Sequence, residues 1–274
     1  MIALFQNTDQ LRLHCSFLDA NLKYEKISPQ AEFESEEIRT LIGDATYQRA
    51  LAHFNSNDYN QEDEQDPTLI VLNRLVHLIQ APVANFAYLS WAPHNDINHT
   101  GNGRSIHVSE DSKPAFEWQV VRSEEALHRT AHRQVDQLLA YLEEKKDILT
   151  EWKDSDERQA NLNLLIADAS TLDAIYPIDR SRWLYTKLSP FLREYQDDVI
   201  IPVIGEERYT GLSNKLTGAD PLAAADKKLL SLIRKPMALF AVALGLKRLS
   251  LKFFPDGIAQ EYQAERTNVK ASQV

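Results

Sequence analysis

The chain has few of the residues that mark disulfide-rich or turn-dense proteins. It contains one cysteine, Cys15, and eight glycines in 274 residues. A single cysteine cannot form an intramolecular disulfide, and the sequence has no cluster of the kind that holds structural zinc. Scarce glycine argues against a turn-dense all-β fold and mildly favours helices. These absences favour a mainly α-helical fold with no disulfide framework.

Basic residues are also scarce, with 30 Lys and Arg against 40 Asp and Glu and a net charge of −10. Non-specific binding to nucleic acid or anionic membranes normally needs a basic surface, so the charge disfavours both partners. The segment MIALFQNTDQLRLHC lacks the basic start and sustained apolar core of a signal peptide. The longest strongly apolar run, Met237–Leu246, is too short to span a bilayer. We therefore expect a cytoplasmic or assembly-associated protein.

What the chain does contain is an internal repeat. Displaced by 154 positions, residues 66–87 align with residues 220–241, and 9 of the 22 pairs are identical. Two further blocks follow the same order upstream. LIGDATYQRAL (41–51) aligns with VIGEERYTGLS (203–213), and YEKISP (24–29) aligns with YTKLSP (185–190). Three blocks in one order predict an internal duplication that gives two related helical lobes.

Each copy carries a proline inside a helical pattern, Pro82 in LIQAPVANFA and Pro236 in LIRKPMALFA. A proline in a helix interior removes one hydrogen bond and crowds the preceding turn, at a cost of roughly 3 kcal/mol. We expect each proline to bend a long helix at the same depth. An Asp-Pro pair upstream predicts each helix start. Asp66 or Asp220 would be the N-cap, followed by Pro67 or Pro221 at the first helical position.

The middle of the chain, residues 104–176, belongs to neither copy. Alternating apolar residues on either side of the polar turn Asp111–Pro114 predict a β-hairpin. These residues are Ile106 and Val108 before the turn, and Phe116, Trp118 and Val120 after it. Ser123 is then expected to cap a long helix that ends near Asp154, with one or two further helices before Pro177. The predicted organisation is a first lobe (1–103), a hairpin-plus-helix insert (104–176) and a second lobe (177–274) with a polar tail.

Two histidine groups have spacings that resemble metal sites. The loop PHNDINH places His94, Asp96 and His99 close together in sequence, but the second copy has KRLSLKF there. In HRTAH, His128 and His132 lie one helical turn apart, in line with Glu124 and Asp136. The zinc-protease motif needs Glu directly after the first His, and Arg129 stands there instead. Ordinary polar surface is the favoured interpretation of both groups, and metal binding stays open.

Three other features are weaker candidates. The acidic loop 57–67 lacks the central glycine and spaced ligands of an EF-hand, so we interpret it as a connector. Cys15 adjoins His14 without a third, orienting group, which is weak evidence for a nucleophile. Trp91, Phe116 and Trp118 could form a binding surface. We expect them in the core instead, because they recur with the period of secondary structure.

The segment GRSIHVSEDSKPAFEWQVVRSEEALHRTAHRQVDQLLAYLEEK, which follows LIQAPVANFAYLSW, resembles an uncharacterised family encoded in phage and prophage structural gene clusters. The resemblance implies a non-enzymatic virion assembly protein, such as a head–tail connector or ring component. It implies no catalytic, cofactor-binding or metal-binding residues, and it implies an oligomer whose partners are portal or neighbouring ring subunits. The protein would then be cytoplasmic, or part of the virion once assembled.

Two other functions remain as alternatives. One is a metal-dependent enzyme using His94, Asp96 and His99, or the His128/His132 pair. The other is a helical binder of small ligands with a cleft between its lobes. Neither a membrane nor a sequence-specific nucleic acid is expected as a partner.

Overall fold

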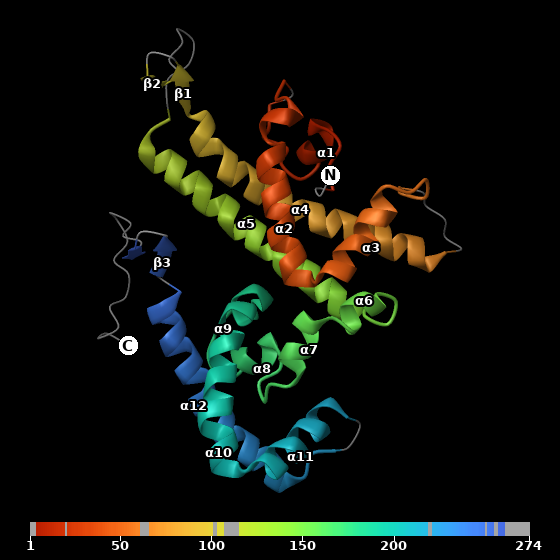
Figure 1. Cartoon of the computed structure of the whole chain (residues 1–274), viewed down its shortest axis with the longest axis vertical. Helices are drawn as coiled ribbons and strands as arrows, with labels where there is room; N and C mark the ends of the chain where they lie inside the picture. Colours follow the sequence, from red (N-terminus) through yellow and green to blue (C-terminus); the bar gives the residue numbers. More distant parts are fainter. Residues whose placement is uncertain are drawn as a thin grey trace. The chain divides into compact units, whose positions relative to one another are not determined.

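The computed structural model describes residues 4–19, 21–60, 66–100, 103–106, 115–218, 221–249, 251–254 and 257–260. The chain divides into two compact units, Met1–Arg158 and Gln159–Val274 (Figure 1). This division falls within the predicted insert 104–176, so its long helix belongs to the first unit. The predicted mainly α-helical class is confirmed.

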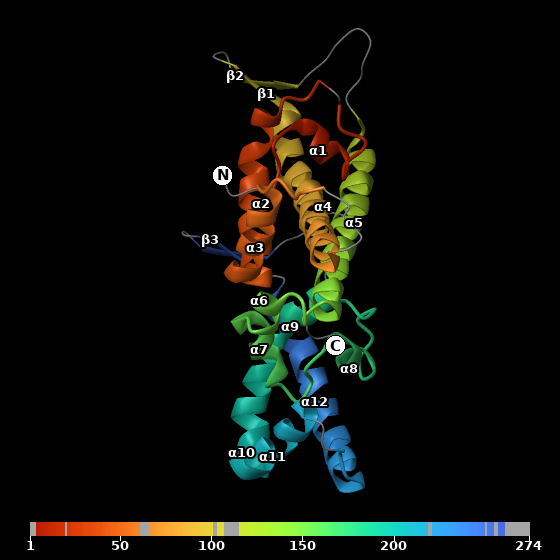
Figure 2. The same cartoon turned by 90° about the vertical axis from the view of Figure 1, so that its right-hand side faces the viewer.

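The first unit contains most of the long helices. Its elements are α1 (Thr8–Arg12), a 3-10 turn (Tyr24–Lys26), α2 (Ser28–Ile42), α3 (Asp44–Phe54), α4 (Pro67–Asn95), β1 (Ile97–Thr100), β2 (Gly103–Ile106), α5 (Glu117–Glu144) and α6 (Thr150–Lys153). Helix α7 (Asp156–Leu162) begins at its end. Helix α4 lies between α2 and α5 and packs against both (Figure 2).

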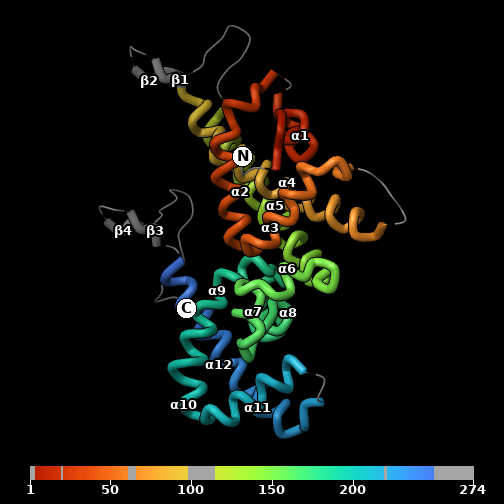
Figure 3. The backbone as a smooth tube through the Cα atoms, turned by 45° about the vertical axis from the view of Figure 1, so that its right-hand side comes forward, coloured from red at the N-terminus to blue at the C-terminus, as the bar shows by residue number. Residues whose placement is uncertain are grey.

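The second unit is also helical. Its elements are α8 (Ala169–Asp173), α9 (Arg182–Tyr195), a π-helical turn (Gln196–Ile200), α10 (Ile201–Ile204), α11 (Glu206–Thr217), α12 (Ala224–Arg248), β3 (Leu251–Phe254) and β4 (Gly257–Gln260). Figure 3 traces α9 beside α12, and these two helices form the main packing contact of the unit. At Gly245 of α12 the backbone comes close to α9, since an added Cβ would lie 2.5 Å from Cδ2 of Leu188.

The predicted β-hairpin was wrong. Its second arm, with Trp118 and Val120, lies in α5, which begins at Glu117 rather than after Ser123. The Gln119 side chain accepts the Phe116 N–H (3.1 Å), and the helix starts seven residues earlier than expected, with Phe116 rather than Ser123 as the N-cap. The five alternating residues instead lie at the start of a 28-residue helix, whose buried stripe is Ala131, Val135, Leu138, Leu139 and Leu142. Helix α5 ends at Glu144, not near Asp154.

The strands among the described residues are short, and one of them, β2, ends at Ile106 of the expected first arm. Strand β1 pairs antiparallel with β2, with Ile97 opposite Ile106 and Thr100 opposite Gly103. Strand β3 pairs antiparallel with β4, with Leu251 opposite Gln260. The other expected arm, around Val108 and the turn Asp111–Pro114, lies outside the described residues, as does the tail after Gln260.

Two of the three repeated sequence blocks form the same succession of elements in each unit. A helix ends at Ile42 or Ile204, a glycine follows, and the next helix carries Tyr47 or Tyr209. A long helix, α4 or α12, comes next. Both predicted prolines lie inside these long helices, which continue through them. The bend at each proline stays a prediction. The remaining repeated block differs, because residues 24–29 form a 3-10 turn and the start of α2, whereas residues 185–190 lie inside α9.

The start of the long helix differs between the units. Asp66 caps α4 as predicted, accepting the Thr68 N–H at 2.8 Å, and Pro67 is the first helical residue. Helix α12 begins at Ala224, so the predicted first-turn position of Pro221 was wrong, and Asp220 lies outside the described residues. The first turn of α12 contains a buried carboxylate, that of Asp226, a charge that is favourable at a helix N-terminus.

Two helices in the described part of the chain, α4 and α12, are long and apolar enough to cross a membrane by length and composition alone. The run Met237–Leu246 is thus part of a longer apolar helix than the sequence suggested. Core helices of soluble proteins pass the same test, so the finding is weak evidence for a membrane. In the most apolar window of each helix, 67% of α4 is buried but only 39% of α12. The two equivalent helices therefore differ in how much protein covers them.

Candidate functional site

The structure does not gather the predicted metal ligands. His94 is exposed in the last turn of α4, Asp96 is the C-cap of that helix, and His99 lies in β1, where only the backbone is described. On α5, the ring centroids of His128 and His132 are 6.1 Å apart. The described residues contain no group of three His, Cys, Asp or Glu side chains that could hold a metal ion.

The His132 side chain packs against a neighbouring helix rather than facing only solvent. Its ring centroid lies 5.5 Å from that of Phe86 on α4, so it helps α5 pack on α4. His128 is exposed, as expected for a polar helix face. The pair therefore straddles the edge of the α4–α5 contact.

Cys15 is fully buried, and burial raises the pKa of its thiol to about 12. A nucleophilic cysteine needs a lowered pKa, so this environment is the opposite of an activating one. The neighbouring His14 does not serve Cys15 as a base. Its Nε2 lies 3.4 Å from Oε1 of Gln80, and its ring lies 4.6 Å from that of His77. Burial, followed by the charge of His77, lowers the pKa of His14 to about 4.

The aromatic residues are not in the core, contrary to our expectation. Phe116 and Trp118 are exposed at the start of α5, and Trp91 is half-buried near the end of α4. Trp91 lines a groove of about 390 Å³ with Tyr88 and Phe17. The alternation at 116–120 therefore does not correspond to a buried face. The acidic loop 57–67 is only partly described, since residues 61–65 lie outside.

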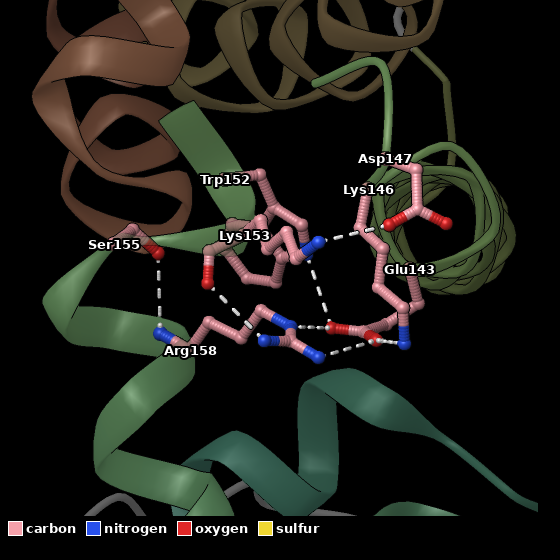
Figure 4. Close-up of polar contacts among 7 residues, drawn as sticks. All are labelled: Glu143, Lys146, Asp147, Trp152, Lys153, Ser155 and Arg158. Atoms are coloured by element: carbon pink, nitrogen blue, oxygen red, sulfur yellow. Dashed lines mark hydrogen bonds and ion pairs between the residues drawn. The ribbon is translucent and has the colours of Figure 1, made fainter. Parts of the chain in front are cut away.

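A polar cluster joins the end of α5 to α6 and α7 (Figure 4). Glu143 accepts hydrogen bonds from Nε of Arg158 (2.7 Å) and from Nε1 of Trp152 (3.1 Å). Lys153 pairs with Asp147 at 3.0 Å. Burial alone would raise the pKa of Glu143, but the hydrogen bond and charge of Arg158 outweigh it and lower that pKa. Since both acids have cationic partners, the cluster is best interpreted as a structural clamp.

The most unusual surface is one side of α12, which we call the α12 stripe. It consists of Lys228, Leu232, Lys235, Leu239 and Leu246, all exposed and spaced by three, four or seven residues. Leu232 is 65% exposed and Leu239 is 47% exposed. Single exposed leucines are ordinary, but a row of them along one helix face is typical of an interaction site.

The equivalent side of α4 is covered. Leu78 aligns with Leu232 and is only 4% exposed. Asn85, which aligns with Leu239, is buried and donates from Nδ2 to Oε1 of Gln134 on α5 (3.0 Å). Nearer the start of α4, the Val71 carbonyl accepts a hydrogen bond from the Tyr141 hydroxyl of α5 at 3.1 Å. Helix α5 thus covers this side of α4, and beyond α12 the described part of the chain contains only the short strands β3 and β4.

The start of α12 is anchored by Asp226. This buried carboxylate is held by NH2 of Arg208 at 2.6 Å and Nζ of Lys215 at 2.8 Å, both on α11. The hydrogen bond from Lys215, followed by the charges of Lys215 and Arg208, lowers the pKa of Asp226 despite its burial. The anchor fixes the helix that presents the α12 stripe.

A groove of about 750 Å³ lies beside the α12 stripe, with which it shares Lys235, and faces α8. Lys227, Arg234 and Lys235 supply positive charge to it, and Ser170 and Thr171 supply hydroxyl groups. Nε of Arg234 donates to the Leu165 carbonyl (2.7 Å), which fixes the position of its guanidinium. The groove is chemically suited to an anionic small molecule.

The comparison with protein families gives one match. The model of a family of unknown function (DUF6712) matches residues 38–161 and 200–274, which is well over half of the chain. The chain belongs to this family. No curated protein and no solved structure matches it. The match covers α3 to α6 in the first unit and α10 to α12 in the second, and so includes both long helices.

Sequence reasoning did not identify the α12 stripe. Its signal was present in the alignment of the two copies, where Lys235 replaces Ala81 and Leu239 replaces Asn85. These substitutions change what the face can bind, but the sequence did not show that a helix covers one copy of the face and not the other.

Proposed function

We propose that the two units are diverged copies of one ancestral lobe and that the protein is a non-enzymatic virion assembly protein, such as a head–tail connector or ring component. The succession of helix, glycine, Tyr-bearing helix and long helix in both units supports the duplication. The resemblance to proteins of phage structural gene clusters supports the assembly role.

The observation that carries the assembly role is the α12 stripe. In the first unit the matching face of α4 is covered by α5 of the same chain. In the second unit the face exposes Leu232, Leu239 and Leu246. A subunit contact would remove this apolar surface from water, as obligate interfaces do.

Native mass spectrometry and light scattering of the full chain test this function. We expect a defined oligomer, several times the 31.3 kDa of one chain. The variant Leu239→Glu should weaken assembly at least about tenfold, because it places a charge in the centre of the contact. Leu13→Glu is the matched control, since Leu13 is exposed in the first unit, outside the stripe. A strictly monomeric wild-type protein would contradict the proposal.

The groove facing α8 favours a second candidate function, the binding of a small anionic ligand. Thermal-shift measurements with phosphate-bearing compounds test it. A ligand should raise Tm in the wild type, and Lys227→Gln should remove most of that rise because Lys227 lines the groove. A uniform absence of shifts across the compounds would count against this candidate.

A further inference from the structure

The proposed assembly role leaves open what covers the α12 stripe, and this inference rests on that role. We propose that the stripe of one copy binds an acidic surface around α10 on the next copy. This surface, which we call the α10 edge, consists of Asp197, Asp198 and Val199 of the π-helical turn, Val203 of α10, and Glu206 and Glu207 of the first turn of α11, all exposed.

The apolar part of the α10 edge projects from the second unit. Val203 is 78% exposed, and Val199 is also exposed, four residues earlier. Helix α9, the π-helical turn and α10 follow one another without a gap, so these valines lie on one side of a continuous helical segment. Together they provide an apolar ridge for the leucines of the stripe.

Charge complementarity identifies the α10 edge as the partner. Lys228 and Lys235 lie in line with the leucines of the stripe. The valines of the edge have two aspartates before them and two glutamates after them. Arg208, the nearest cation that follows, is bound to Asp226. A contact between the two surfaces therefore pairs lysines with carboxylates around an apolar centre.

The lysines disfavour other occupants of the stripe. In a two-fold pairing of α12 with α12, Lys235 would lie near its own copy, because it is close to the middle of Ala224–Arg248. A helix that packed on α12 as α5 packs on α4 would contact Lys235. At the aligned position α4 has Ala81, which is small and buried, so the two faces do not suit the same partner helix. A bilayer would have to accommodate the same charge near the centre of the helix.

The contact joins two different surfaces, so every copy has one of each to offer. Such head-to-tail contacts build rings when the rotation closes and filaments when it does not. A contact between the α12 stripe and the α10 edge would therefore build the proposed ring. The contact and the assembly role can still be tested separately.

Reciprocal charge reversal tests the contact. One variant carries Lys228→Glu and Lys235→Glu, and the other reverses all four acids of the α10 edge with Asp197→Lys, Asp198→Lys, Glu206→Lys and Glu207→Lys. Each alone would place like charges against each other, and we expect its subunit affinity to fall at least about tenfold. An equimolar mixture should assemble again, since both junctions then pair opposite charges. Added salt should weaken the wild-type contact.

Circular dichroism and Tm establish that both variants are folded, and Trp118→Ala is the control at an exposed aromatic outside both surfaces. Light scattering of the equimolar mixture then shows whether assembly is restored. If Leu239→Glu dissociates the oligomer but the mixed variants do not recover assembly, the α10 edge is the wrong partner, while the assembly role stands. A monomeric wild type overturns both. Flotation of the wild type with anionic vesicles, abolished by Leu239→Glu, would instead assign the stripe to a membrane.

Discussion

Gly43 and Gly205 have the same backbone conformation although 162 residues separate them. Gly43 has φ 84° and ψ 143°, and Gly205 has φ 84° and ψ 146°. Each ends one helix and precedes the helix that carries Tyr47 or Tyr209. Side chains with a Cβ rarely adopt this region, so both positions require glycine for the same steric reason.

Alanine at either glycine should therefore destabilise the protein. We expect Gly43→Ala and Gly205→Ala each to cost about 1–3 kcal/mol of unfolding free energy. The two costs should be similar, because the atom closest to the new Cβ at Gly43, Oε2 of Glu157 at 2.6 Å, is the end of a flexible side chain that can move aside, and the space at Gly205 is open. Denaturant unfolding measures both. Gly211→Ala is the control within α11, and it should be neutral or stabilising because that position is also open and has no positive φ.

The aligned leucines Leu78 and Leu232 should respond very differently to truncation. Leu78→Ala removes a buried side chain from the α4–α5 contact, so we expect a loss of about 2–5 kcal/mol. Leu232→Ala should change the stability of the monomer by less than about 0.5 kcal/mol, because its side chain is largely exposed. Denaturant unfolding at low protein concentration gives both values. Equal losses would show that α12 is covered within the monomer.

His14 should make the protein acid-sensitive. Its folded pKa of about 4 lies below the unfolded value of 6.5, so between these pH values the unfolded chain binds more protons. The unfolding free energy should therefore fall as pH drops from 6.5 toward 4, and His14 should contribute no slope above 6.5. Burial also lowers the pKa of His77, which adds to the same slope.

Replacing His14 tests this dependence. Unfolding curves of His14→Gln should show a smaller loss of stability between pH 6.5 and 4 than the wild type. His94→Gln, at an exposed position, is the control. An identical slope in wild type and His14→Gln would rule out His14 as its source.

Asp226→Asn should loosen the start of α12. The change removes the charge that Arg208 and Lys215 bind, leaving two cations beside a buried amide. We expect Tm to fall by several degrees at pH 7. Because the folded pKa of Asp226 is lowered, its contribution is present above the unfolded value of 3.8 and is lost as pH falls through the folded one. The difference between variant and wild type should therefore shrink in strong acid. Lys227→Gln, beside it on the exposed side, serves as the control.

Local sequence determined the elements whose signals are local. The Asp66-Pro67 pair started α4 where predicted, and the apolar stripe from Ala131 to Leu142 placed the buried side of α5. The two Ile-Gly steps marked helix ends in both copies. Local signals failed at two other helix starts. The side chain of Gln119 accepts the Phe116 N–H, so that α5 starts before Ser123, and α12 starts beyond Pro221, at Ala224.

Burial was decided only by the tertiary structure. Leu78 and Leu232 stand in similar apolar stretches, each four residues before a proline, and the sequence predicts the same environment for both. Leu78 is buried because α5 returns along α4, while in its own unit Leu232 has no equivalent helix among the described residues. A period in the sequence shows which residues share a face. Whether water or protein meets that face depends on distant parts of the chain, and this is why the candidate interaction surface emerged only from the fold.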